Sequence, residues 1–89
     1  MPPVPSIVTR AELTAVIERD GDGYVALCPE VDVASEGNTV QEARTNLEEA
    51  VGLFFETASD IEVKRRIQSE VYVTRIQVPV RVTQPNAMG

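Results

Sequence analysis

The sequence predicts an α+β fold in which three strands, one amphipathic helix and a final strand follow one another (β-β-β-α-β). Two runs of alternating apolar residues flank a turn rich in Gly and Asp, and a short third run follows the second. A helical segment with a clear N-terminal cap comes next, and a β-branched run comes last. This order predicts one helix packed on a mainly antiparallel sheet, in two layers around a single core.

The first two strands are expected on either side of a tight turn. Ala11–Glu18 alternates, with Leu13, Ala15 and Ile17 on one face, as is typical of a half-buried strand. Asp20–Gly23 then supplies residues that tolerate the positive φ angles of a primed hairpin turn. Tyr24–Cys28 is the expected returning strand.

An acidic bend separates the second strand from the third. Pro29 ends the second strand or places it at an edge, because proline has no amide hydrogen to donate. Val31–Glu36 is the expected third strand.

The strongest helical signal begins at Thr39. Thr39 and Glu42 have the spacing of a capping box, in which each side chain satisfies an otherwise unpaired amide. Apolar residues then recur at three- and four-residue steps and form one stripe: Val40, Ala43, Leu47, Ala50, Val51, Phe54 and Ala58. Leu53 and Phe55 lie off the centre of this stripe. They indicate either self-association or a wide core face on a small domain, and the sequence leaves both open.

The C-terminal third is expected to hold a last strand. Asp60–Glu70 is either a short helix or an irregular link, and Val71–Val82 is a long β-branched run. Pro79 within this run indicates an edge strand or a strand end. Because an exposed β-branched edge is normally covered, we expect Val71–Val80 to pair with another chain or to lie at the sheet edge. The candidate self-association residues are Leu53, Phe55, Tyr72, Ile76 and Val78.

We expect one domain over residues 11–82, a flexible lead-in over residues 1–10 and a polar tail over residues 83–89. Four aromatic residues and no Trp in a chain of 89 residues make a thin core. A domain of this size often gains stability by burying surface against a partner or its own copy, so a dimer or tetramer is expected. Cys28 is the only cysteine, which favours a reducing cytoplasm. No run has the roughly 18 apolar residues of a membrane span, so no membrane association is expected.

The charge is distributed unevenly along the chain. The formal net charge is −6, but the segment Glu12–Glu62 holds thirteen acids and only two bases, Arg19 and Arg44, a net charge of −11. An acidic body repels phosphate backbones and disfavours direct nucleic-acid binding. The same field attracts a basic protein partner, and a role in solubility alone explains it equally well.

The sequence offers little catalytic chemistry. Histidine, the usual general base near neutral pH and the commonest metal ligand, is absent. Cys28 has no histidine to activate it and is expected to be a buried structural thiol. Asp20 and Asp22 have the spacing that opens a calcium loop, but Val31 stands where the bidentate Glu is needed. A hairpin turn explains these two acids better.

Two further charged clusters are candidate metal or phosphate sites. Glu30 and Asp32 could together hold magnesium, but a metal nuclease needs more acids converging from other elements, so we expect a solvated acidic rim. Lys64–Arg66 has no interleaved aromatic residues and is expected to be a solvated face. No catalytic, cofactor or metal site is assigned, and we do not expect an enzyme.

The segment Asp20–Glu56, DGDGYVALCPEVDVASEGNTVQEARTNLEEAVGLFFE, closely resembles the HicB family of antitoxins. In that family the pattern GYVA-x-CPE-x-D-x-x-S-x-G-x-T-x-x-EA-x-x-NL-x-EA runs through strand, bend and helix. The segment Glu70–Val80, EVYVTRIQVPV, is similar to the closing strand of short HicB-like proteins. The resemblance covers residues 11–82.

The resemblance implies a degraded ribonuclease H-like fold without its catalytic acids. It also implies a partner, HicA, which is a small basic ribonuclease toxin whose catalytic histidine the antitoxin occludes. Tyr24, Glu30 and Asp32 match the family's strand and bend, and they are the candidate partner contacts. Full-length HicB proteins carry a C-terminal DNA-binding module with no counterpart after Val82, so no direct DNA binding is expected.

Three functions are consistent with these observations. The first is an antitoxin module of a type II toxin-antitoxin system. The second is an orphan HicB-like homo-oligomer with neither toxin nor DNA-binding activity. The third and most remote is a residual metal-dependent ribonuclease, which predicts magnesium-dependent RNA cleavage that Glu30→Gln abolishes.

Overall fold

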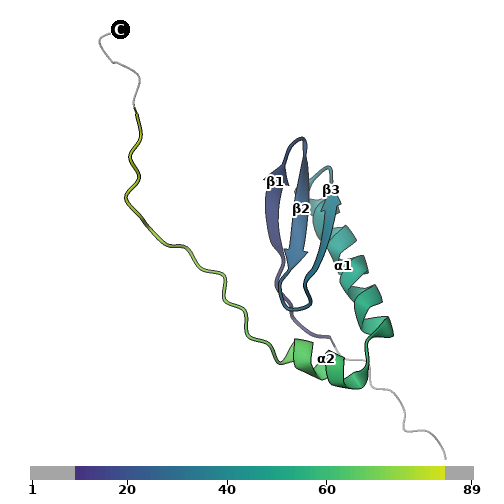
Figure 1. Ribbon diagram of the computed structural model, residues 1–89. Helices are drawn as coiled ribbons and strands as arrows, with labels where there is room; N and C mark the ends of the chain where they lie inside the picture. Colours follow the sequence, from purple (N-terminus) through teal and green to yellow (C-terminus); the bar gives the residue numbers. More distant parts are fainter. Residues whose placement is uncertain (1–9, 84–89) are drawn as a thin grey trace, which may run out of the picture.

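The computed structural model describes residues 10–83, so the expected lead-in, apart from Arg10, and tail residues 84–89 lie outside the described part. Its elements are β1 (Val16–Asp20), β2 (Gly23–Cys28), β3 (Val33–Gly37), α1 (Val40–Thr57) and α2 (Asp60–Ile67). The three strands form one antiparallel sheet in the order β1-β2-β3. Helix α1 packs on one face of this sheet, and α2 follows it at the lower end (Figure 1). The predicted α+β class is confirmed.

A two-residue turn joins β1 to β2. Gly21 has a φ of 61°, and a glycine at the first central position of such a turn is typical of type II′. The pair Asp20–Gly23 closes the turn, and the pairing continues to Val16–Leu27. The predicted primed hairpin is confirmed.

β1 begins later than the predicted Ala11, at Val16. If the pairing continued beyond Val16–Leu27, Thr14 would lie opposite Pro29, which has no N–H to donate. The Thr14 N–H is instead donated to the carboxylate of Glu30, at 2.9 Å from Oε2. Residues 11–15 are therefore an approach to the sheet and not part of the β1–β2 ladder.

The turn between β2 and β3 occupies Pro29–Asp32, so β3 begins at Val33 and not at Val31. Asp32 has a φ of 56°, in the left-handed region that aspartate tolerates better than most residues with a side chain. Cys28 and Val33 form the pair nearest the turn.

Helix α1 begins where the sequence predicts. The Oγ1 of Thr39 accepts the N–H of Glu42 at 3.0 Å, as a capping residue should. The Glu42 carboxylate accepts the N–H of Asn38 at 3.1 Å, one residue before the cap. Gly37 permits the close approach of this helix end to β3, because a Cβ built there would lie 2.5 Å from the backbone nitrogen of Ala43.

The core lies between α1 and the sheet. Its buried apolar residues are Ala26, Cys28, Val31, Ala43 and Leu47. Two alanines at the contact allow the helix to lie close to β2 and β3, and this core is as small as the composition predicts. The helix contacts β3 and β2 far more than β1, so the helix-facing side of β1 is the least covered part of the sheet.

The C-terminal third differs most from the prediction. Asp60–Glu70 contains helix α2, which Ser59 caps by accepting the N–H of Glu62 at 3.1 Å. The predicted fifth element is not a strand: residues 71–82, here called the C-terminal arm, are extended but pair with no strand in the described part of the chain. The arm leaves the end of α2 and runs away from the sheet (Figure 1). A β-branched run favours extended backbone, but a strand also needs a neighbour, and α2 directs this run away from its own sheet.

Candidate functional site

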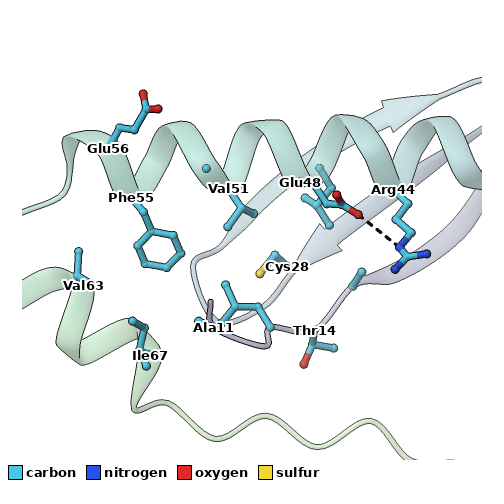
Figure 2. A pocket seen from close by; sticks show the side chains of 14 residues that line it. Ala11, Thr14, Cys28, Arg44, Glu48, Val51, Phe55, Glu56, Val63 and Ile67 are labelled. Carbon is cyan, nitrogen blue, oxygen red and sulfur yellow. Dashed lines mark ion pairs between the residues drawn. The ribbon is translucent and has the colours of Figure 1, made fainter. Parts of the chain in front are cut away.

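An apolar groove of about 720 Å³ opens between α1, α2 and the approach to β1. Phe55 projects from α1 toward Val63 of α2 and toward Ala11 (Figure 2). The groove lies where residues 11–15 approach the sheet, and none of the residues of β1 lines it. Its other apolar lining residues are Leu13, Ala15, Leu47, Val51 and Ile67.

Charged residues of α1 also line the groove. Arg44 and Glu48 form an exposed ion pair at 3.6 Å, drawn as a dashed line in Figure 2. Glu56 lies further along the same helix. The groove therefore combines an apolar interior with charged side chains from one helix, which suits an amphipathic polypeptide segment.

Glu30 is buried, and its carboxylate is hydrogen-bonded to Thr14. Its side chain is 8% exposed, and it accepts hydrogen bonds from the N–H of Thr14 at 2.9 Å and from the Thr14 hydroxyl at 2.7 Å. The Cys28 thiol lies 3.5 Å from the same carboxylate. The expectation of a solvated acid is therefore wrong for Glu30, because its carboxylate accepts the Thr14 N–H that would face the carbonyl oxygen of Pro29 if the ladder continued. Asp32, on the same turn, is exposed as expected.

The two titratable groups of this turn have opposite pKa shifts. Burial acts to raise the pKa of Glu30, but the hydrogen bonds from Thr14 and from backbone amides outweigh it and hold the pKa below its usual value. Burial, reinforced by the neighbouring Glu30 carboxylate, raises the pKa of the Cys28 thiol. Cys28 is thus a poor nucleophile, in agreement with the buried structural thiol that the sequence predicts.

Tyr24 lies at the other end of β2 from Glu30 and Asp32. It is half-buried, and its hydroxyl accepts a hydrogen bond from Arg19 at 3.2 Å. The Arg19 guanidinium also stacks on the ring, 5.5 Å from the centroid. The structure therefore does not bring the three candidate partner contacts into one cluster.

The candidate self-association residues fall into two groups. Phe55 is half-buried in the groove, whereas Leu53 is 62% exposed on a different part of α1. Tyr72, Ile76 and Val78 are all exposed on the C-terminal arm. Phe55 thus belongs to a wide apolar face beside the core, one of the two explanations that the sequence left open.

The basic run on α2 is partly structural. Arg66 donates to Glu62 at 2.6 Å and to the carbonyl oxygen of Glu30 at 3.4 Å, and its guanidinium lies 5.9 Å from the centre of the Phe54 ring. The expected solvated face is confirmed for Lys64 and Arg65, which are exposed. It is wrong for Arg66, which fastens α2 to α1 and to the β2–β3 turn.

The sequence reasoning missed the groove, although signals for it are present. Val63 and Ile67 are four residues apart and share one face of α2. Leu13 and Ala15 were assigned to one strand face, but nothing in the local pattern indicated that this face would stay uncovered.

Within residues 10–83, no group of three or more His, Cys, Asp or Glu side chains is placed to hold a metal ion. No helix in this part of the chain combines the length and apolar character needed to cross a membrane. Comparisons of the chain with protein-family models, with curated proteins and with solved structures found no match.

Proposed function

We propose that the chain is a non-enzymatic antitoxin module of HicB type, which binds and occludes a small basic RNA-cleaving toxin of HicA type. The observation that carries this proposal is the exposed, largely unpaired negative charge of the body. Of the acids between Glu12 and Glu62, all except Glu30 and Glu62 themselves are exposed. In the described residues, ion pairs involve only two of these acids, Glu48 and Glu62.

Part of this negative charge surrounds a depression where β2 begins. A depression of about 390 Å³ at this end of the sheet is lined by Asp20, Tyr24, Glu36 and Glu42, here called the acidic end. Three carboxylates beside an aromatic ring, set against the single base Arg19 that stacks on that ring, suit a basic protein surface, because opposite charge steers association and aromatic residues anchor interfaces. Of the three residues that the family resemblance nominates, Tyr24 lies in this surface.

Co-expression and pull-down with the basic protein of a neighbouring reading frame test the proposal. We expect co-purification and loss of RNA cleavage by that protein, both weakened as salt is raised. The variant Asp20→Asn/Glu36→Gln should weaken binding more than the control Glu49→Gln/Glu56→Gln, which removes the same charge elsewhere. A toxin that neither co-purifies nor loses its activity would contradict the proposal.

The C-terminal arm favours a second candidate, a homo-oligomeric HicB-like module that acts without a toxin. The arm exposes a β-branched surface that a monomer leaves uncovered. Sedimentation velocity tests the homo-oligomeric candidate, because a strictly monomeric chain at micromolar concentration argues against it. An oligomer that binds no basic ribonuclease supports the homo-oligomeric module over the antitoxin.

A further inference from the structure

The C-terminal arm has the alternation of a strand but pairs with no strand among residues 10–83, and only its first residues, Val71 and Tyr72, share a hollow with Leu13 and Thr14. Its even-numbered residues form one apolar face: Tyr72, Thr74, Ile76, Val78, Val80 and Val82. Tyr72 and Ile76 are each 80% exposed. In the described chain the side-chain hydrogen bonds of the arm are local, from Tyr72 to Glu70 and from Thr74 to Arg75. The arm therefore has an apolar face to bury and backbone groups to pair.

Of the two sheet edges, β1 is the less occupied one in the described residues. Because the turn closes on the Asp20–Gly23 pair, antiparallel alternation points the backbone groups of Ile17 and Arg19 away from β2. No hydrogen bond from another described residue reaches those groups. At the opposite edge, the outward carbonyl of Glu36 already accepts the side-chain amide of Asn46 at 2.8 Å.

The groove supplies an apolar surface beside residues 11–15, which lead directly into this edge. Ile17 pairs with the fully buried Ala26, so its side chain lies on the helix-facing side of the sheet. A fourth strand next to β1 would extend the helix-facing side of the sheet below α1. Val51 and Phe55 of α1 line the groove there. The face carrying Tyr72, Ile76 and Val78 matches this interior in chemistry.

The other face of the arm is basic and matches the open face of β1. Arg75 and Arg81 are its charged residues, and the arm contains no acid. On β1, Glu18 and Asp20 lie on the sheet face away from α1 and are exposed. Opposite charges on neighbouring strands stabilise their pairing, and the acidic body as a whole attracts a basic strand.

We infer that the arm of one copy lies as a fourth strand along β1 of a second copy, with Tyr72, Ile76 and Val78 in the groove of that copy. A second copy is favoured over the arm's own body because α2, fastened through Arg66, directs the arm away from its own sheet (Figure 1). An arm over residues 71–82 spans roughly 40 Å when extended, enough to cross to another body and follow its β1 edge. Reciprocal exchange of arms closes a two-fold dimer.

Light scattering on the full chain tests this exchange with two neighbouring substitutions. We expect the native chain and Gln77→Lys, which adds a charge to the basic face, to have at least twice the mass of the 9.7 kDa monomer. Ile76→Lys adds the same charge to the apolar face and should give a monomer. The circular dichroism spectrum should change little, because Ile76 is exposed in the single chain. A monomeric native chain, or equal effects of the two substitutions, overturns the inference.

Cysteine cross-linking separates exchange from return of the arm to its own β1. One chain carries Glu18→Cys and a co-expressed chain carries Val73→Cys, Arg75→Cys or Gln77→Cys in turn, while Cys28 stays buried in both. A disulfide joining the two different chains at one of these positions is expected. A cross-link that forms only when both substitutions are in the same chain overturns the inference.

This inference does not rest on the toxin proposal and specifies the homo-oligomeric candidate, although Asp20 belongs both to the acidic end and to the face of β1 that meets the basic side of the arm. Ile76→Lys leaves the acidic end unchanged, because that surface is built from β1, β2, β3 and the start of α1. A monomeric Ile76→Lys chain that still binds a basic toxin supports both proposals. A dimer that binds no toxin supports the exchange and contradicts the toxin proposal alone.

Discussion

The buried carboxylate of Glu30 gives the sharpest test of how this small sheet is held together. Glu30→Gln keeps the shape of the side chain and removes its charge. Two donors of Thr14 bond to the carboxylate, at 2.9 and 2.7 Å. A hydrogen bond to a charged group contributes about 1.5–3 kcal/mol and a neutral one about 0.5–1.5 kcal/mol, so the substitution should lower the free energy of unfolding by about 2 kcal/mol.

The pH dependence of this difference gives a second, independent check. The pKa of Glu30 is held below that of an unfolded glutamate, which is about 4.3. A carboxyl group with a lowered pKa stabilises the fold fully above the unfolded pKa and loses that contribution as the pH falls through the folded pKa. The stability difference between the native chain and Glu30→Gln should therefore shrink in acid.

Urea denaturation followed by circular dichroism, near neutral pH and in acid, measures both effects. Asp32→Asn is the matched control, because Asp32 is an exposed acid on the same turn and asparagine also tolerates its φ of 56°. It should change stability by less than about 0.5 kcal/mol. Equal stability of Glu30→Gln and the native chain near neutral pH would refute the reasoning, as would a difference that does not change with pH.

Three further outcomes follow from the same contacts. Gly37→Ala should strongly lower the free energy of unfolding in the same urea assay, since the new Cβ would lie 2.5 Å from the backbone nitrogen of Ala43. Gly52→Ala is the contrasting change: its Cβ meets nothing within 4 Å, so it should stabilise α1 by up to about 1 kcal/mol. Thr39→Ala should lower the free energy of unfolding by about 1 kcal/mol through loss of the helix cap, and Thr39→Ser should retain most of it; equal losses would contradict the capping role. Cys28 should react slowly with a thiol reagent in the native chain and rapidly in urea, because burial raises its pKa; fast native labelling would show an accessible thiol.

The sequence predicted the parts of the fold that depend on nearby residues. The Gly21 turn and the Thr39 cap require only local backbone chemistry, and both are found where expected. The start of β1 was missed because it depends on Thr14 meeting Glu30, sixteen residues away. For residues 60–70 the sequence allowed either a short helix or an irregular link, although Ser59 and Glu62 repeat the capping spacing seen at α1.

The candidate site was predicted less well than the fold, for a related reason. Glu30 looks like a surface acid in the sequence because nothing local shows that Thr14 returns to bind it. The apolar faces of the arm were identified, but their partner was not. A strand's neighbour depends on topology, and here no neighbour lies within the described part of one chain.

The hydrogen bond from Asn46 to Glu36 limits how far this sheet can grow. With that edge occupied, each chain offers one strand to give and one edge to receive. Two such chains use both arms and both β1 edges, so the outer edges of the pair are the added arms and the β3 strands, where the Glu36 carbonyl is already bonded. One helix side chain in this way removes an acceptor from an edge strand and makes edge-to-edge addition of another chain at β3 less favourable.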